Sequence, residues 1–324
     1  MILSTSTKEE IIMEISAKQV KELRDLTGCG IMDCKKALIE AEGDVEKAKD
    51  WLREKGMAKA EKKASRVAAE GVVASVISDD MKTGAIVEVN IETDFAAATD
   101  KFKSFVEDVK TQIMTVKPAD IDALKASAMY NDSSKTVELA TKEAIADIGE
   151  NTSVRRFALY EVNGNGAITS YIHMGGKVGV LVEFSVSDDS VIKTDAFQTM
   201  AKNIGMQIAA SNPSWVAESE VPQAALDRET EIIKNKALEE GKPAQIIETR
   251  IVPGQIKNFY KLNVLLDQEY VKDEDKTIAQ YIDAESKAMG VEISVARFTR
   301  YGLGDGIEKK EEDFAEEVRK QAGL

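Results

Sequence analysis

Histidine, cysteine and proline are scarce in this chain, whose 324 residues include one His, two Cys and five Pro. The single imidazole, His173, and the two thiols, Cys29 and Cys34, do not supply the set of nitrogen and sulfur ligands that a zinc site needs. So few cysteines indicate buried, reduced thiols in a cytosolic protein and not a disulfide framework. The sequence therefore predicts no metal site, and it gives no sign of another cofactor.

Long apolar runs are also missing. No segment approaches the ~20 apolar residues of a membrane-spanning helix. Residues 1–12 have neither the basic start nor the hydrophobic region of a signal peptide. We therefore expect a cytoplasmic protein without a membrane partner. Because Met13 begins a segment typical of a natural start, we expect residues 1–12 to form a flexible extension.

Basic residues are outnumbered, since 57 acidic against 43 basic side chains give a net charge of -14. A phosphate backbone is bound by clustered Lys and Arg, so this balance argues against direct binding to nucleic acid. The charge is uneven, because residues 13–66 hold 13 basic and 11 acidic groups. We expect this N-terminal segment to meet a different surface from the rest of the chain.

Motifs of covalent catalysis are absent as well. The sequence has no GxxxxGKS/T phosphate loop, no GxGxxG after an expected strand, no nucleophile elbow and no HExxH. His173 falls at the end of an expected strand beside two glycines. A lone His without a Ser, Cys or metal partner is more often a structural or contact residue than an acid–base catalyst. The sequence therefore identifies no catalytic residue.

The chain begins with a helical pattern. Apolar residues follow helical spacing from Ser16, the segment TGCG interrupts them, and a second helix is expected from about Met32 to Ala41. A third helix is expected to start at Glu42-Gly43-Asp44. Together with an Ala/Lys-rich tether, this predicts a three-helix module over residues 13–66.

A repeat in the middle of the chain is visible without gaps. The segment from Gly71 aligns with the segment from Gly166, an offset of 95 residues. Identical pairs recur along both copies: Gly71 and Gly166, Ser75 and Ser170, Ile77 and Ile172, Lys82 and Lys177, Gly84 and Gly179, Glu88 and Glu183, Asp94 and Asp189, Phe102 and Phe197, Gln112 and Gln207. Each copy has two β-rich segments around a Gly-containing turn and then a helix. This pattern predicts a duplicated α+β core.

The two copies give the core its expected boundaries. The first copy falls in residues 67–150, and the second in residues 151–212 and 258–306. A further strand, VRRFALYEV from Val154, is expected to lead into the second copy.

Residues 213–257 leave the repeat pattern. A helix opened by Pro222, a turn and a second helix predict an inserted antiparallel helical hairpin, or coiled coil. A hairpin that projects toward another subunit and one that packs flat on its own domain are both open at this point. Residues 307–324 are expected to form a C-terminal helical module.

Phe95 is unusual because it lies between acids and alanines in VNIETDFAAATDKF. Both copies keep the preceding acid, at Asp94 and Asp189, which predicts that this position caps the following helix. The second copy has Ser190 where the first has Phe95, although a shared core position should be apolar in both. The mismatch favours a contact role in the first copy, and a hydrophobic staple at the helix start stays open.

Three longer motifs stand out: LRDLTGCGIMDCKKAL from Leu23, EVNIETDF from Glu88 and GENTSVRRF from Gly149. They resemble signatures of the bacterial translation elongation factor Ts family. The resemblance implies an α+β protein with an N-terminal ubiquitin-associated-like module, a two-part core, a dimerising hairpin and a C-terminal helix. It implies a guanine-nucleotide exchange factor, without covalent chemistry, for the GTPase elongation factor Tu.

The same resemblance assigns roles to particular residues. Thr93, Asp94 and Phe95 match a motif whose Asp-Phe pair enters the nucleotide domain of the GTPase and disturbs its magnesium and phosphate site. Four further positions match residues that touch the same nucleotide domain: Lys21, Arg24, Ile31 and Met32. His173 matches a position that touches another domain of the GTPase. The chain departs from the family pattern at Ala96 and Ala98, just after the motif, and at Pro253 in the hairpin.

Other functional classes remain as alternatives. The N-terminal module could serve a non-enzymatic adaptor that binds a ubiquitin-like or other partner, with the core as a scaffold. An enzyme would have to rely on His173, for which the sequence shows no second catalytic group.

Overall fold

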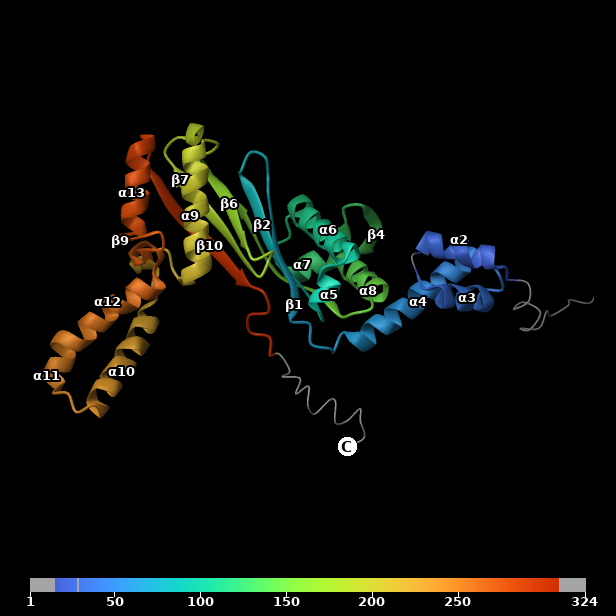
Figure 1. Cartoon of the computed structure of the whole chain (residues 1–324), viewed down its shortest axis with the longest axis horizontal. Coiled ribbons are helices and arrows are strands. Elements are labelled where there is room, and N and C mark those ends of the chain that lie inside the picture. The colour runs from blue at the N-terminus through green and yellow to red at the C-terminus, as the bar shows by residue number, and fades with distance from the viewer. Residues whose placement is uncertain (1–14, 28, 309–324) are drawn as a thin grey trace, which may run out of the picture. The chain divides into compact units, whose positions relative to one another are not determined.

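The structure is a computed structural model that describes residues 15–27 and 29–308. The described residues fall into two compact units, and most of their helices and strands are labelled in Figure 1. Unit 1 holds the described residues of Met1–Val72, Glu88–Arg156 and Leu303–Leu324, and unit 2 holds Val73–Val87 and Phe157–Gly302. Helices and small sheets are mixed, in agreement with the predicted α+β class. The expected extension at residues 1–12 lies outside the described residues, as does the expected C-terminal helical module at 307–324 apart from its first two residues.

The N-terminal module consists of helices α2 (Ala17–Thr27), α3 (Ile31–Glu40) and α4 (Val45–Lys63). Asp44 caps α4 by accepting hydrogen bonds from the backbone N–H groups of Glu46 and Lys47, and the helix begins directly after the predicted start at Glu42-Gly43-Asp44. The buried residues around which the helices pack include Val20, Leu23, Cys34, Ala37, Leu38, Ala41, Ala48 and Leu52. Helix α4 continues through the Ala/Lys-rich segment and packs against α8 (Val137–Ile148).

Unit 1 continues with a short series of helices and strands. They are α5 (Asp94–Ala97), α6 (Asp100–Val116), α7 (Ile121–Ala126), β3 (Ala128–Met129), β4 (Asp132–Thr136) and then α8. Strands β1 (Glu70–Ile77), β2 (Thr83–Ile91) and β5 (Thr152–Glu161) each contribute residues to both units. They form one sheet in the order β1-β2-β5.

Unit 2 repeats this series. Its elements are β6 (Gly166–His173), β7 (Val178–Val186), η1 (Asp189–Val191), α9 (Asp195–Ser211), η4 (Leu265–Asp267), β8 (Glu269–Tyr270), β9 (Asp273–Thr277), α13 (Ile278–Met289) and β10 (Ile293–Gly302). The antiparallel sheet has the order β10-β7-β6, and α9 packs against β6 and β7 (Figure 1). Phe184 and Phe197 meet edge to face in this core, with ring centroids 5.6 Å apart.

The repeat extends further than the gapless alignment shows. Residues of β5 recur in β10 at an offset of 141: Val154 as Val295, Arg156 as Arg297, Phe157 as Phe298 and Tyr160 as Tyr301. In the sheets, β5 neighbours β2 as β10 neighbours β7. Strand β5 is therefore the closing strand of the first copy, and does not merely lead into the second copy as the sequence suggested.

A buried glutamine supports the same turn in each copy. Gln112 accepts a hydrogen bond from the backbone N–H of Tyr130 (2.7 Å), and Gln207 accepts one from the N–H of Val271 (2.9 Å). Gln112 also donates to the carbonyl of Ala128 (2.8 Å), and Gln207 donates to the carbonyl of Glu269 (3.2 Å). Both side chains are fully buried, so these bonds satisfy groups that would otherwise destabilise the fold.

The helical hairpin is an insertion into the second copy. The first copy runs from Pro118 to buried Leu124, whereas the second runs from Pro213 to buried Leu265 with 46 additional residues. After the short helix η2 (Glu218–Glu220), the insertion contains α10 (Gln223–Glu239), α11 (Ala244–Ile246), η3 (Ile247–Ile251) and α12 (Val252–Asn263). Helices α10 and α12 pack against each other and extend away from the sheet of unit 2 (Figure 1).

The second arm of the hairpin changes geometry before Pro253. Ile247–Ile251 form a π-helical turn, after which α12 continues to Asn263. Proline has no N–H to donate and its ring crowds the carbonyl four residues earlier, so a wider turn accommodates it. The departure from the family pattern at Pro253 is thus accompanied by a π-helical turn, and the arm continues as a helix after it.

Glu88 of β2 is a fully buried carboxylate in unit 1. It accepts hydrogen bonds from Arg155 Nη1 (2.9 Å), Arg156 Nε (2.5 Å) and the backbone N–H of Gly304 (2.8 Å). Burial by itself raises the pKa of this carboxyl, but the bonds from Gly304 and the two arginines outweigh burial and lower the pKa. Gly304 has a φ of +75°, and a Cβ there would lie 2.7 Å from the carbonyl oxygen of Ala69, so this loop requires glycine.

Candidate functional site

The corner after β2 holds Phe95 in solvent. Thr93 starts the short helix α5 by accepting a hydrogen bond at Oγ1 from the N–H of Ala96 (3.2 Å). Ala96 is buried, whereas the side chain of Phe95 is 85% exposed. A core residue or a hydrophobic staple would be covered by neighbouring side chains, so neither interpretation holds for Phe95.

Asp94 is not the helix cap that the repeat predicted. It is the first residue of α5 and is exposed, and the cap is Thr93. In the second copy, too, the cap lies one residue earlier, because Asp188 accepts a hydrogen bond from the N–H of Ser190 (2.9 Å). The prediction was therefore wrong by one residue in both copies. Because Thr93 is the cap, the Asp94 carboxylate is exposed, directly before Phe95 in the chain.

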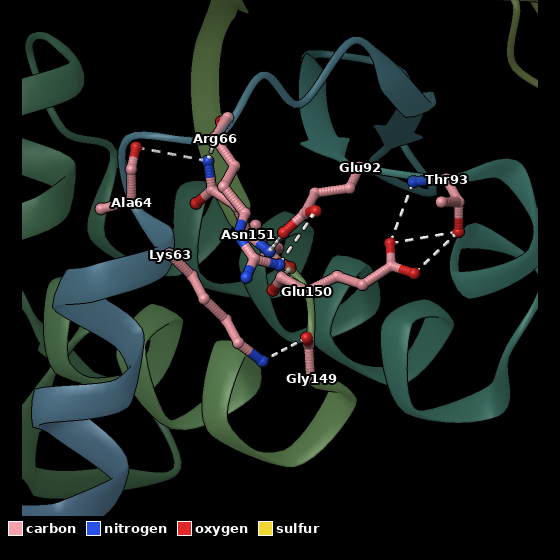
Figure 2. A network of polar contacts seen from close by, with 9 residues as sticks. Lys63, Ala64, Arg66, Glu92, Thr93, Gly149, Glu150 and Asn151 are labelled. Carbon is pink, nitrogen blue, oxygen red and sulfur yellow. Dashed lines mark hydrogen bonds and ion pairs between the residues drawn. The ribbon is translucent and has the colours of Figure 1, made fainter. Parts of the chain in front are cut away.

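Glu150 binds the Thr93 corner from the loop after α8. Its carboxylate accepts hydrogen bonds from the backbone N–H of Thr93 (2.9 Å) and from the Thr93 hydroxyl (2.9 Å). Figure 2 shows the carboxylate facing both groups of Thr93. The Thr93 hydroxyl thus donates to Glu150 and accepts from Ala96, which links the loop to the first turn of α5.

The same loop is bound to the end of α4 (Figure 2). The backbone N–H of Asn151 donates to Glu92 Oε1 (2.6 Å), and its side-chain Nδ2 donates to the carbonyl of Arg66 (2.7 Å). Lys63 donates from Nζ to the carbonyl of Gly149. Asn151 is buried, so its bonds are shielded from competing water. The loop therefore joins the Phe95 corner to the helix that ends the N-terminal module.

The N-terminal module carries an exposed basic and apolar face. Lys21, Arg24 and Ile31 line a groove that also includes Lys35. Ile31 is 56% and Met32 is 66% exposed, which is unusual for side chains of their size. These side chains have the chemistry of a protein-binding surface, because apolar contacts are framed by positive charge.

His173 lies at the end of β6 in unit 2, beside an exposed turn. The hydroxyl of Tyr171 lies 3.3 Å from its Nδ1, and the two rings are stacked with centroids 6.0 Å apart. The next residue, Met174, is 72% exposed. A phenol does not orient and charge an imidazole as a carboxylate does in a catalytic triad. This arrangement fits a contact surface better than acid–base catalysis.

Metal and thiol chemistry find little support in the described residues. Within 15–27 and 29–308, no cluster of three or more His, Cys, Asp or Glu side chains could hold a metal ion. Cys34 is buried and burial raises the pKa of its thiol, which disfavours a nucleophilic thiolate. Among these residues there is also no helix with the length and apolarity needed to cross a membrane.

Comparisons with known proteins now identify the family. A family model described as "Elongation factor TS" matches residues 92–305, and one described as "Elongation factor Ts, mitochondrial, N-terminal" matches residues 4–61. The chain belongs to the elongation factor Ts family. Elongation factor Ts of Trichlorobacter lovleyi is 49% identical over 312 residues, which cover 96% of this chain and 100% of that protein. Elongation factor Ts of Clostridium botulinum is 48% identical over 309 residues, which cover 95% and 99%.

The elongation factor Ts matches contain every candidate contact residue named from the sequence. The structure brings Thr93, Asp94 and Phe95 together in one corner, and it places Lys21, Arg24, Ile31 and Met32 on the N-terminal module and His173 in unit 2. Sequence reasoning missed Glu150 and Asn151. Their signal was a polar run directly after the helix-ending Gly149, within a motif already typical of elongation factor Ts.

Proposed function

We propose that this chain is a guanine-nucleotide exchange factor for elongation factor Tu, acting in translation elongation in the cytoplasm. The observation that carries the proposal is the 85% exposure of Phe95 on a corner fixed by Glu150. A large apolar side chain held in water has no stabilising role in the free protein. Burying it in a partner gains about 1.5 to 3 kcal/mol, so the corner is suited to insertion.

Exchange requires no covalent bond to break. Asp94 and Phe95 enter the nucleotide domain of elongation factor Tu as a wedge, with Phe95 displacing side chains and Asp94 offering a carboxylate near the displaced magnesium and phosphate site. The factor must bind the nucleotide-free GTPase more tightly than the GDP-bound form. Reciprocity then requires that the factor weaken GDP binding by the same ratio. The binding energy of the whole contact is thus used to release nucleotide.

Other surfaces supply the remaining binding energy. The groove of Lys21, Arg24 and Ile31, together with Met32, binds the same nucleotide domain through apolar contacts and positive charge. His173, beside the exposed Met174, binds another domain of the GTPase. The net charge of -14 argues against direct contact with nucleic acid.

The proposal is tested by loading elongation factor Tu with fluorescent GDP and adding this chain with excess unlabelled GDP. We expect release of the label to accelerate with chain concentration and then to saturate. We also expect excess GDP with magnesium to dissociate the complex of the two proteins. Binding without accelerated release would instead support the adaptor alternative, and no binding at all would refute both.

The hairpin is proposed to form a homodimer. On α10, Ile232 is 51% and Leu238 is 56% exposed. Large apolar side chains in solvent do not stabilise an isolated hairpin, and they are typical of an interaction surface. We expect light scattering to give twice the chain mass, and replacement of both residues by Asp to give the mass of one chain. A chain that stays monomeric at about 50 µM, or a double variant that stays dimeric, would contradict this interface.

A further inference from the structure

The orientation of the Phe95 side chain is not fixed by packing around it. This side chain is 85% exposed, so little packing in the free protein holds it, and its orientation follows the backbone of α5. That helix spans Asp94–Ala97, a single turn. A single helical turn is unstable in isolation, because nucleating a helix fixes several backbone angles for one hydrogen bond. Something outside α5 must therefore hold the corner.

Glu150 is placed to do this. It reaches Thr93 at the backbone N–H and the hydroxyl, and the hydroxyl passes the restraint on to the N–H of Ala96 in α5. Hydrogen bonds to a carboxylate are stronger than those between neutral groups, and bonds in a chain reinforce one another. One carboxylate therefore fixes both the entry and the first turn of α5.

The Glu150 backbone is itself restrained on both sides. Before it, Gly149 ends α8 in the left-handed conformation, with a φ of 93°, and its carbonyl is bound by Lys63. After it, buried Asn151 donates to Glu92 and to the carbonyl of Arg66. Figure 2 shows these contacts converging on the loop, with Glu150 directed at Thr93. The carboxylate is thus presented from a fixed backbone.

We propose that Glu150 is a positioning residue for nucleotide exchange, which holds the Thr93 corner so that Phe95 is presented in one orientation. This inference rests on the proposed exchange function. A restrained wedge loses less conformational freedom on insertion than a frayed one. Since initial binding also uses the N-terminal module and unit 2, Glu150 should affect the maximal rate of GDP release more than the concentration of factor at half-maximal rate.

The experiment measures GDP release from elongation factor Tu as a function of the concentration of the full chain. For Glu150→Ala, we expect a maximal rate about tenfold lower, with less than a threefold change in the half-saturating concentration. Glu150→Gln keeps an oxygen that accepts from Thr93 and should fall between the wild type and Glu150→Ala. The matched control is Glu143→Ala on α8, which removes ion pairs with Lys135 and Arg53 but no contact to the corner.

The deciding comparison is made in the Phe95→Ala background. If Glu150 acts by presenting Phe95, adding Glu150→Ala to that variant should change the maximal rate by less than twofold. A further tenfold loss would overturn the inference, because it would show a structural effect independent of the wedge. A full rate for Glu150→Ala alone would also overturn it. A full rate for Phe95→Ala would refute the proposed wedge itself, so the two failures are distinguishable.

Discussion

Phe95→Ala is expected to lower the maximal rate of GDP release from elongation factor Tu by about 30-fold or more. Truncating an aromatic anchor at the centre of an interface typically removes about 2 kcal/mol or more, and each 1.36 kcal/mol is a factor of about ten in rate. The fold should not respond. A side chain that is 85% exposed contributes little to stability, so the free energy of unfolding should change by less than about 0.5 kcal/mol. Stopped-flow fluorescence of labelled GDP measures the first quantity and urea unfolding the second.

Controls separate the wedge from a general loss of apolar surface. Tyr130→Ala removes another exposed aromatic side chain of unit 1, 43% exposed, and should leave GDP release unchanged. Asp94→Ala should slow release less than Phe95→Ala, because it removes a charge and leaves the apolar side chain that fills space. Equal release rates for Phe95→Ala and the wild type would rule out the wedge.

Glu88→Ala is expected to lower the free energy of unfolding by about 3 to 5 kcal/mol. The substitution leaves Arg155, Arg156 and the N–H of Gly304 without the buried carboxylate that they bind, and removing one partner of a buried ion pair costs about this much. Urea or thermal unfolding followed by circular dichroism measures the loss.

The repeat provides a matched control for this prediction. Glu183 is the counterpart of Glu88 and accepts a hydrogen bond from Arg297 Nε (2.6 Å), but the side chain of Arg297 is 51% exposed. Solvent screens such a pair, so Glu183→Ala should cost only about 1 kcal/mol. Equal losses for the two variants would show that burial is not what makes Glu88 important.

Stability should also depend on pH through Glu88. Its pKa in the folded protein is lowered, so the folded state binds a proton at this site less readily than the unfolded state. The stability contributed by the carboxylate is therefore fully present above the ordinary value of 4.5 and is lost as pH falls through the lower folded pKa. The difference in unfolding free energy between the wild type and Glu88→Gln should shrink over that range. A constant difference down to pH 3 would contradict the assignment.

Local sequence signals predicted the elements whose cause is local. Helical spacing and the Glu42-Gly43-Asp44 turn predicted the helices of the N-terminal module. The presence of Ser190 in the second copy, where the first has Phe95, correctly pointed away from a shared core position. The prediction of the helix cap was wrong because Thr93 and Asp94 are adjacent and either residue type can cap a helix. The backbone geometry selects Thr93. The identity of the acid in both copies favoured the wrong neighbour.

Long-range relations were harder to predict. Strand β5 was not assigned to the first copy because 46 inserted residues shift its counterpart from an offset of 95 to 141. The role of Glu150 depends on contact with Thr93, 57 residues away in the chain, and no local pattern specifies that pairing. The candidate wedge was thus visible in the sequence, but its support was not.

The junction from Pro213 to Leu265 shows that the duplication of the core came before the difference in length between its two copies. Its counterpart in the first copy, Pro118 to Leu124, spans the same step in far fewer residues, and both proline and leucine are shared. Because the copies agree on each side of the junction and differ within it, the length difference arose after the ancestral segment had duplicated. The same reasoning applies to Phe95 and Ser190. The features that both copies share therefore predate the duplication. The difference at the hairpin and the difference between Phe95 and Ser190 arose later, as the two copies diverged.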